Sequence, residues 1–306
     1  MNNKIHVVFA TDNKFCPYAS VAIVSLLENN KNESICVHLF SMNIASENLE
    51  KIELMISRYD NAQLEIHSVT NSSFEHFPDP GIYSLACYLR ILIPDLLSTV
   101  DKALYLDCDL TICGSIRELW NLDISNYSCA AVADAIYSYN ATQAYLEYDY
   151  FSEGYANSGV LLMNLAYWRK NDIQNKLIDF LNKHSVKYPD QDAINIILHG
   201  TIKFIHPKWN CHTGYFAFPP LVRKEQKQYI KSLWKKAIIV HYTGRVKPWF
   251  KECVNPYKHH YSKYKQITPW KNTPQKQFEP LVMNRYRIVF LRYCKNFIAK
   301  LLSYTY

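Results

Sequence analysis

The 306-residue chain is poor in glycine, and its few glycines exclude two phosphate-binding motifs. It contains 7 glycines, where average usage would give roughly 21. No two of them form a Gly-x-Gly, so the dinucleotide-binding fingerprint and the Walker phosphate loop are both absent. His-Glu-x-x-His and Gly-x-Ser-x-Gly are absent as well, which excludes the commonest zinc-protease and serine-hydrolase signatures.

Paired cysteines and long apolar runs are also missing. The 9 cysteines are scattered without a Cys-x-x-Cys pair, which favours reduced thiols in a cytosolic protein. Asp12 interrupts the apolar start of the chain before it reaches the length of a signal sequence, and no uninterrupted apolar run is long enough to span a membrane. With 49% hydrophobic and 20% charged residues, the chain is instead expected to bury a full core.

Hydrophobic periodicity changes repeatedly between strand and helix along the first 250 residues. Short β-branched runs bounded by polar residues predict strands, and apolar residues at helical spacing predict the helices between them. Strands that alternate with helices indicate βαβ units, so we predict one α/β domain whose sheet is closed by the last strand. The predicted strands cover 4–10, 35–41, 64–69, 102–106, 130–133, 159–165, 203–205 and 237–240, and the predicted helices 18–27, 49–59, 84–97, 172–184 and 190–199.

The end of the chain differs from the rest in charge and composition. The formal net charge is +7, and from Pro280 onward five cations occur without an acidic side chain: Arg285, Arg287, Arg292, Lys295 and Lys300. Apolar and aromatic residues recur there at helical spacing, so a basic helix could lie on an anionic membrane surface or pack on the domain. We predict a main domain over 1–265 and a basic aromatic tail over 266–306.

Two aspartates follow directly after one predicted strand. Asp107, Cys108 and Asp109 come after the strand over 102–106, and ligands of open α/β sheets bind at the carboxyl ends of strands. Like charges at about 4 Å repel by roughly 4 kcal/mol at an effective dielectric of about 20, so a divalent cation between the carboxylates would be favourable. Two hydrated loop aspartates are the alternative. A second Asp-x-Asp follows Pro189, where an aspartate is an ordinary helix N-cap.

Further polar segments occur at the ends of predicted strands. Asp12 follows the first strand, and Asn157-Ser158-Gly159 precedes the apolar run from Val160. The segment Pro189-Asp190-Gln191-Asp192 comes later, and His-Tyr-Thr-Gly-Arg-Val-Lys-Pro-Trp over 241–249 ends the last strand. A single histidine after an apolar strand is more often structural than a metal ligand. A glycine and a lysine within the next six residues make this segment indicative of a diphosphate and metal site.

Taken in order, these motifs resemble the retaining glycosyltransferases of family 8, which include glycogenin and bacterial lipo-oligosaccharide galactosyl- and glucosyltransferases. The resemblance extends from about Ile5 to Trp249. Its specific marks are the Asp-x-Asp, the Asn-Ser-Gly-Val-Leu-Leu segment and the His-Tyr-x-Gly-x-x-Lys-Pro-Trp segment. It implies an α/β fold of the GT-A type that binds nucleotide sugars, with a mixed, mostly parallel central sheet flanked by helices and followed by a C-terminal basic helical tail.

The resemblance also implies site residues. Asp107, Asp109 and His241 would hold Mn²⁺ at the phosphates of a UDP-sugar, because mixed oxygen and imidazole ligands suit Mn²⁺ better than Mg²⁺. Lys14 departs from the family pattern, which has a small polar residue near the base. The donor-binding residues implied are Ala10 and Asp12 at the uridine, Gly244 and Lys247 at the diphosphate, and Asp134, Asn157, Asp190 and Gln191 at the hexose. Arg90 would reach toward the donor from its helix, and Asp107 and Cys108 also belong to the donor-binding set.

Retention of the anomeric configuration allows two mechanisms. Either a protein nucleophile attacks the far face of the sugar, or the acceptor attacks the face from which UDP departs. Gln191 is the family position nearest to a nucleophile, with Asp190 beside it, and we name both as candidate catalytic residues. Because an amide oxygen is a poor nucleophile, we favour same-face attack assisted by Gln191.

The predicted activity is transfer of galactose or glucose from UDP to a lipopolysaccharide or lipo-oligosaccharide glycan. The same chemistry on a protein, a teichoic acid or another surface glycan is an alternative. A non-catalytic protein that binds membranes or nucleic acid through its tail is a third, although five cations without a nucleic-acid-binding fold are a weak footprint, so no nucleic acid is expected. The expected location is the cytoplasm, with peripheral attachment to the inner face of the cytoplasmic membrane.

Overall fold

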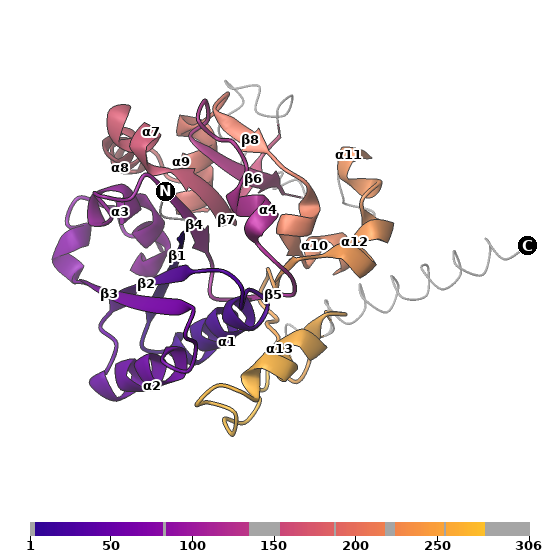
Figure 1. Cartoon of the computed structure of the whole chain (residues 1–306). Coiled ribbons are helices and arrows are strands. Elements are labelled where there is room, and N and C mark those ends of the chain that lie inside the picture. Colours follow the sequence, from indigo (N-terminus) through magenta and orange to yellow (C-terminus); the bar gives the residue numbers. More distant parts are fainter. Residues whose placement is uncertain are drawn as a thin grey trace, which may run out of the picture.

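A computed structural model describes residues 4–81, 84–134, 154–186, 188–217, 224–253 and 255–278. Its centre is a seven-stranded sheet of order β3-β2-β1-β4-β7-β6-β8 (Figure 1). Neighbouring pairs from β3 to β4 are parallel, whereas β7 runs antiparallel to both β4 and β6. The α/β class and the mixed, mostly parallel sheet are therefore confirmed.

The predicted strands and helices occur in the predicted order, and further short elements lie between and after them. The strands are β1 (Ile5–Asp12), β2 (Ile35–Met42), β3 (Ala62–Val69), β4 (Lys102–Leu106), β5 (Leu110–Ile112), β6 (Cys129–Ala133), β7 (Ala156–Asn164), β8 (Ile202–Phe204), β9 (Cys211–His212) and β10 (Ile239–His241). The helices include α1 (Cys16–Glu28), α2 (Ser46–Ile56), α3 (Leu89–Leu96), α4 (Arg117–Trp120), α7 (Leu165–Lys170), α8 (Ile173–Lys183) and α9 (Pro189–Ile197). Further along are α10 (Gly214–Ala217), α11 (Lys224–Lys227), α12 (Ile230–Lys236) and α13 (Lys258–Lys265), with 3-10 turns at Asn71–Phe74, Leu85–Tyr88 and Pro207–Trp209.

The central strands of the main sheet are buried on both faces, as expected of parallel strands joined by helices, whereas β3 at its edge is only partly buried. Alternate residues of β1 enter two different cores: Val7 and Phe9 pack with α1, α2 and α13, whereas Val8 packs with α3, α7, α8 and α9. Figure 1 shows α1, α2 and α13 together on one side, with α7, α8 and α9 on the other. Because both faces are covered, a ligand has access to the sheet mainly at its strand ends.

We predicted that the last strand closes the main sheet, and this prediction was wrong. Ile239–His241 forms β10, which lies between β5 and β9 in a separate three-stranded sheet. It pairs antiparallel with β5, so that His241 stands opposite Leu110. The short strand β5 was not predicted, because three residues carry too little periodicity to reveal it. Its pairing brings the His241 segment to the residues that follow β4.

The single helix predicted over 84–97 is divided into a 3-10 turn and a shorter α-helix. Ser84 accepts a hydrogen bond from the Ala86 N–H at 3.3 Å and caps the turn Leu85–Tyr88. Pro94 lies inside α3, which ends two residues later at Leu96. The helix therefore ends within one residue of the predicted end, and the difference lies at its start, where the 3-10 turn takes the place of the first helical residues.

The chain beyond α13 lies against the main domain as far as Phe278. The backbone of Lys276 bonds to Trp249 and Lys251 at 3.0 Å each, and the Phe250 and Phe278 rings meet edge to face. The predicted tail helix, with its five cations, falls on residues outside the described part of the chain. Among the described helices, none combines the length and the hydropathy that crossing a bilayer requires.

Candidate functional site

Polar side chains from four strands meet at one edge of the main sheet. Asp12 ends β1, Asp107 follows β4, and Asp134 follows β6. Asn157 lies near the start of β7, and because β7 is antiparallel to β4 and β6, its start lies at the edge where those two strands end. The expectation that these motifs share an edge is met, although Asn157 to Gly159 form part of the strand rather than precede it.

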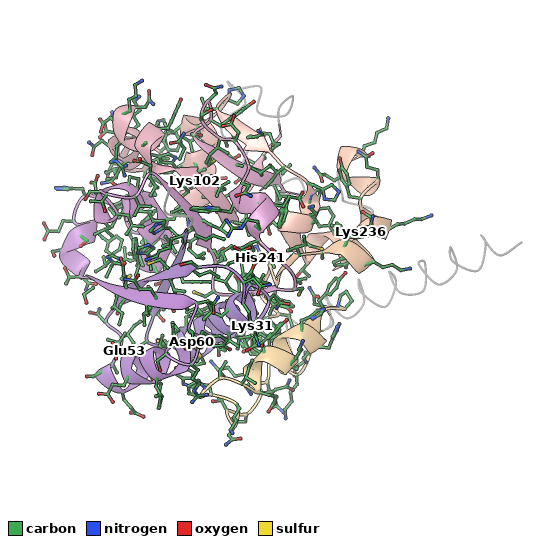
Figure 2. All side chains as sticks on the ribbon, in the orientation of Figure 1. Lys31, Glu53, Asp60, Lys102, Lys236 and His241 are labelled. Carbon is green, nitrogen blue, oxygen red and sulfur yellow. The ribbon has the colours of Figure 1, made fainter. Side chains whose placement is uncertain are left out.

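Asp107, Asp109 and His241 form a cluster with the donor set of a divalent metal site. The Nε2 atom of His241 lies 3.1 Å from Oδ1 of Asp109 and 3.7 Å from Oδ2 of Asp107. One ligand atom of each residue falls within 4.8 Å of the other two. His241, near the centre of Figure 2, is 3% exposed, so the cluster is largely withdrawn from solvent. Two carboxylates and one imidazole are ligands that Mn²⁺ accepts.

Gly159 is required by the close approach of this cluster to the backbone of β7. A Cβ atom at residue 159 would lie 2.6 Å from Oδ2 of Asp107 and 2.9 Å from Nδ1 of His241, with Cε1 of His241 closer still. Real Cβ contacts are never this short. The glycine of the Asn-Ser-Gly motif therefore makes room for two of the three metal ligands.

The orientation of His241 is determined by a chain of hydrogen bonds that starts at the backbone. The Gly159 N–H donates to Oδ1 of Asn157 at 3.2 Å, while Nδ2 of Asn157 donates to Asp134 at 3.2 Å. Oδ1 of Asn157 also accepts from Nδ2 of Asn210 at 2.8 Å, which leaves Oδ1 of Asn210 facing Nδ1 of His241 at 3.0 Å. Since an amide oxygen only accepts, His241 must carry its proton on Nδ1.

In the neutral imidazole this tautomer leaves the lone pair of Nε2 facing the two carboxylates. Three lone pairs then converge on one point, which is the arrangement that a metal ion would bind. Hydrogen bonding of the second imidazole nitrogen is also the usual way in which a protein orients a metal-binding histidine. The residues present therefore fit the divalent cation that the sequence motifs imply.

Arg90 and Lys247 supply the positive charge of the site. Arg90 is 6% exposed and donates to Oδ1 of Asp107 at 2.8 Å, to Ser158 O at 2.6 Å and to Oγ of the same serine at 2.9 Å. Lys247 donates to Oδ2 of Asp109 and to the Tyr242 carbonyl. Burial by itself raises the pKa of the Asp109 carboxyl, but the Lys247 ammonium beside it outweighs burial and holds that pKa well below its usual range. Asp109 is therefore a carboxylate at neutral pH.

The two oxygens of Asp107 have different surroundings. Oδ1 accepts hydrogen bonds from Arg90 and from the Tyr105 hydroxyl, each at 2.8 Å. Burial raises the pKa of Tyr105, so its hydroxyl keeps its proton and acts as a donor. Oδ2 faces His241. One oxygen thus holds the carboxylate in place while the other remains directed at the metal position.

Asp190 and Gln191 lie at the start of α9 and contact Ser158. Oδ2 of Asp190 lies 3.1 Å from Arg90 Nη1 and accepts from Oγ of Ser158 at 3.1 Å, and burial raises the pKa of the Asp190 carboxyl. Oε1 of Gln191 accepts from the Ser158 N–H at 3.1 Å. Both candidate catalytic side chains are therefore oriented by the Asn-Ser-Gly motif of β7.

The residues predicted to bind uridine lie at the end of β1, next to the metal cluster. The thiol of Cys108 donates to the Ala10 carbonyl at 3.2 Å, which joins the Asp-x-Asp segment to β1. Asp12 accepts from the N–H groups of Lys14 and Phe15 at 2.9 Å each, so its Oδ1 stabilises the turn into α1. Lys14 thus contributes backbone to this turn.

The loop after β10 carries the remaining predicted residues. Gly244 has φ of 89°, in the left-handed region, and a Cβ there would meet no atom within 4 Å. The glycine is needed for this backbone conformation rather than for space. The turn returns Lys247 toward the site, where its ammonium contacts Asp109.

Asn210 and Ser158 are important members of the site whose roles the sequence did not reveal. Asn210 is fully buried and lies between Asn157 and His241, while Ser158 joins Arg90 to Asp190 and Gln191. Ser158 belongs to a recognised motif but had no assigned role. Asn210 follows Trp209 in a stretch without an evident motif, and only its burial among polar partners identifies it.

Comparisons with known proteins show which family and which fold the chain resembles. The family model described as Glycosyl transferase family 8 matches residues 6–253. General stress protein A of Bacillus subtilis is 31% identical over 87% of this chain and 94% of its own length. A lipopolysaccharide 1,2-glucosyltransferase of Escherichia coli is 27% identical over 96% of this chain and 87% of its own length. The solved structure of galactosyltransferase LgtC with donor and acceptor sugar analogs matches with a TM-score of 0.73 at 22% identity, covering 88% of this chain and 99% of that one.

Proposed function

The chain belongs to glycosyltransferase family 8, and on that premise we propose that it is a retaining hexosyltransferase that uses a UDP-sugar and Mn²⁺. The observation that carries the proposal is the convergence of Nε2 of His241 with the carboxylates of Asp107 and Asp109, in an orientation fixed by Asn210. These three residues would hold the cation, at the strand edge where nucleotide ligands of α/β sheets bind. When bound, the cation supplies charge that stabilises the departing UDP.

The cationic side chains have separate roles in this proposal. Arg90 is held by Asp107, Asp190 and Ser158, so it keeps the metal-binding carboxylate in place and lends positive charge to the donor pocket. Lys247 extends from a flexible stem and contacts Asp109. We expect the Lys247 ammonium to move from Asp109 to the diphosphate when the donor binds. Gly244 would allow the backbone to approach the diphosphate closely.

The contacts of Gln191 and Asp190 favour attack on the face from which UDP departs. Oε1 of Gln191 already accepts the Ser158 N–H, and Oδ2 of Asp190 is engaged by Arg90 and the Ser158 hydroxyl. A carboxylate paired with a buried guanidinium is a weak nucleophile because its charge is already compensated. In this proposal the two side chains orient the hexose, together with Asp134 and Asn157, and Gln191 stabilises charge that develops on the sugar.

The proposed acceptor is a lipopolysaccharide or lipo-oligosaccharide glycan, and the sugar is galactose or glucose. Support comes from the lipopolysaccharide glucosyltransferase and the galactosyltransferase among the similar proteins. Transfer to a protein or to another surface glycan is the alternative, and a panel of acceptors incubated with the labelled donor distinguishes them. Only a hydroxyl that accepts the hexose with an α-linkage supports the proposed retaining activity.

The first experiment measures UDP release from UDP-galactose and UDP-glucose with Mn²⁺ and then with a chelator. We expect chelator-sensitive release from one donor, and loss of that release in Asp109→Asn. Asp60→Asn is the matched control, because Asp60 is exposed and lies in the turn before β3, outside the cluster. Absence of donor turnover, together with absence of Mn²⁺-dependent donor binding, would reject the proposal and favour a non-catalytic binding protein.

We further propose that the chain divides into a catalytic domain over 1–265 and a basic aromatic tail over 266–306, whose cationic part beyond Pro280 binds an anionic membrane surface. The five cations between Arg285 and Lys300 support this, since each contributes about 1 kcal/mol near anionic headgroups. Attachment to the inner face of the cytoplasmic membrane would follow. Sedimentation of the full chain with anionic vesicles, compared with neutral vesicles and with a variant in which these five residues are glutamine, tests the tail. Equal sedimentation of the two proteins would contradict it.

A further inference from the structure

A second group of metal-ligating side chains crosses three neighbouring strands of the main sheet. His6, His38 and His67 come from β1, β2 and β3, and each points to the face on which Val8, Phe40 and Val69 are buried. His6 precedes Asp12 by six residues along the same strand, a separation of about 20 Å. The group is therefore distinct from the cluster around Asp107.

Three ligand atoms in this group converge on one point. Nδ1 of His38 lies 3.1 Å from Nε2 of His67 and 3.3 Å from Oε2 of Glu65, and the three atoms lie within 4.8 Å of one another. Ligands of a tetrahedral zinc ion at about 2.1 Å are separated from each other by about 3.4 Å. Two of the three separations are thus already close to those of a zinc site.

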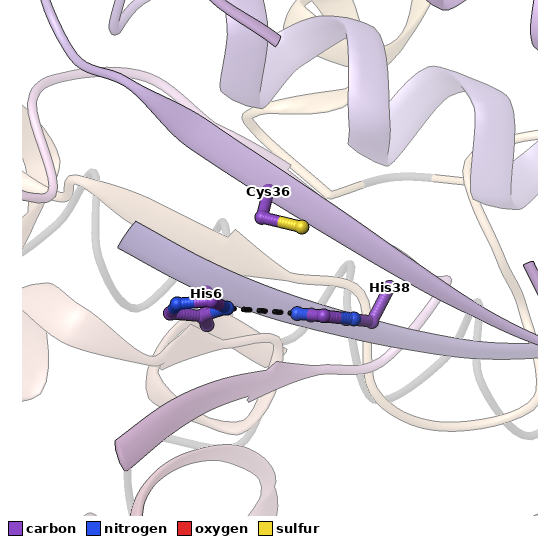
Figure 3. A group of neighbouring side chains, drawn as sticks. All are labelled: His6, Cys36 and His38. Carbon is purple, nitrogen blue, oxygen red and sulfur yellow. Dashed lines mark hydrogen bonds between the residues drawn. The ribbon is translucent and has the colours of Figure 1, made fainter. Parts of the chain in front are cut away.

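His38 and Glu65 each use their other ligand atom, the one directed away from this point, in a contact with a neighbouring side chain. Nε2 of His38 lies 2.9 Å from Nδ1 of His6, with the two rings inclined by only 17° (Figure 3). Oε1 of Glu65 accepts from the Cys36 thiol at 3.3 Å. Outer partners of this kind orient metal ligands and select the imidazole tautomer. A proton on Nε2 of His38, donated to His6, leaves Nδ1 free as a ligand.

We propose that His38, Glu65 and His67 form a zinc site, with water as the fourth ligand and with His6 and Cys36 as outer positioning residues. Two imidazoles and one carboxylate are a frequent zinc donor set, softer than the one around Asp107. The Glu65 side chain is 41% exposed, which gives the ion access from solvent. The ion would link β2 to β3, the strand at the end of the sheet, and so stabilise that edge.

An alternative ion position between His6, Cys36 and His38 is less favourable. It requires the Cys36 thiol to lose its proton together with its hydrogen bond to Oε1 of Glu65, and it requires His6 and His38, whose nitrogens already face one another at 2.9 Å, to turn apart. The site through Glu65 and His67 leaves both of these contacts in place.

The test is a Zn²⁺ titration of the full chain against a chromogenic chelator. An Asp109→Asn/His241→Ala variant removes the first metal cluster, and we expect it to retain one tight Zn²⁺ equivalent. Added to that background, Glu65→Gln or His67→Gln should lower the Zn²⁺ affinity by at least tenfold, and His6→Leu by about 10 to 100-fold. His76→Gln, at an exposed histidine, is the control. Affinity equal to the control in both ligand variants would overturn the proposal.

A second measurement tests the ligand set itself and whether each variant folds. Circular dichroism and the melting temperature of the metal-free proteins should match those of the control, because Glu65 and His67 are only partly buried. The Co²⁺-loaded protein should show tetrahedral d–d bands without a thiolate charge-transfer band. A thiolate band that disappears in Cys36→Ser would reject the assigned ligands in favour of the alternative position. The inference does not depend on the proposed transferase activity, since Zn²⁺ binding is measured without a sugar donor.

Discussion

Replacing Gly159 by alanine adds one methyl group at the point where β7 passes closest to the metal cluster. The new Cβ would lie 2.6 Å from Oδ2 of Asp107 and 2.9 Å from Nδ1 of His241. Carbon atoms in good contact stay about 3.5 Å from their neighbours, so strand or ligands must move by about 1 Å. Neither ligand can move freely, because Asp107 is held by Arg90 and His241 by Asn210.

The expected cost has two parts. Overpacking of a buried site lowers the free energy of unfolding by about 1–3 kcal/mol. A displacement of about 1 Å in a catalytic constellation lowers the rate by about 100-fold. Gly114→Ala is a matched control, since a Cβ there would lie 3.6 Å from Ile238, an ordinary contact, and neither glycine has a positive φ. We therefore expect a large effect at residue 159 and little effect at residue 114.

The assay combines Mn²⁺ affinity, donor turnover and urea unfolding for the wild type, Gly159→Ala and Gly114→Ala. Adding His241→Ala to the Gly159 variant removes the nearest obstruction, so the stability cost of the alanine at 159 should shrink by about 1 kcal/mol in a double-mutant cycle. Wild-type Mn²⁺ affinity and turnover in Gly159→Ala, or no coupling between the two positions, would refute the steric argument.

Three further outcomes follow from the contacts of single side chains. Asn210→Leu removes the acceptor for Nδ1 of His241 and should lower Mn²⁺ affinity about 10 to 100-fold in calorimetry; an unchanged affinity would show that the tautomer needs no partner. Lys247→Met removes the ammonium that contacts Asp109, so the Mn²⁺ affinity measured without donor should rise, while kcat should fall by about 10 to 100-fold. A fall in both quantities would contradict the expected movement of the Lys247 side chain to the diphosphate. Burial lowers the pKa of His38 from an ordinary 6.5 to about 4 in the folded chain, so the unfolded chain takes up the proton first as pH falls. Urea unfolding in chelator should show full stability above pH 6.5 and a loss of about 2 kcal/mol toward pH 4, allowing for solvent screening, and His38→Gln should flatten that slope.

Local patterns predicted most of the fold because the signal for a strand or helix lies within a few residues. β1, β2 and β4 were predicted to within two or three residues of their ends, since each is a β-branched or apolar run bounded by polar residues. β5 and β9 were not predicted, because strands of three and two residues are too short to show an alternating pattern. Helix α3 was predicted too long because its cap at Ser84 belongs to a separate turn.

The sequence by itself determined that two carboxylates follow a buried strand, that a histidine, a glycine and a lysine follow another, and that helices cover both faces of a sheet. These are consequences of residue order, and they carry the family resemblance. Only the tertiary structure decided how the two segments meet. His241 reaches Asp109, 132 residues away, through the pairing of β10 with the unpredicted β5. The reversal of β7 brings Asn157 and Gly159 to the same edge. Long-range pairing and steric closeness depend on which residues become neighbours in space, and no local pattern contains that information.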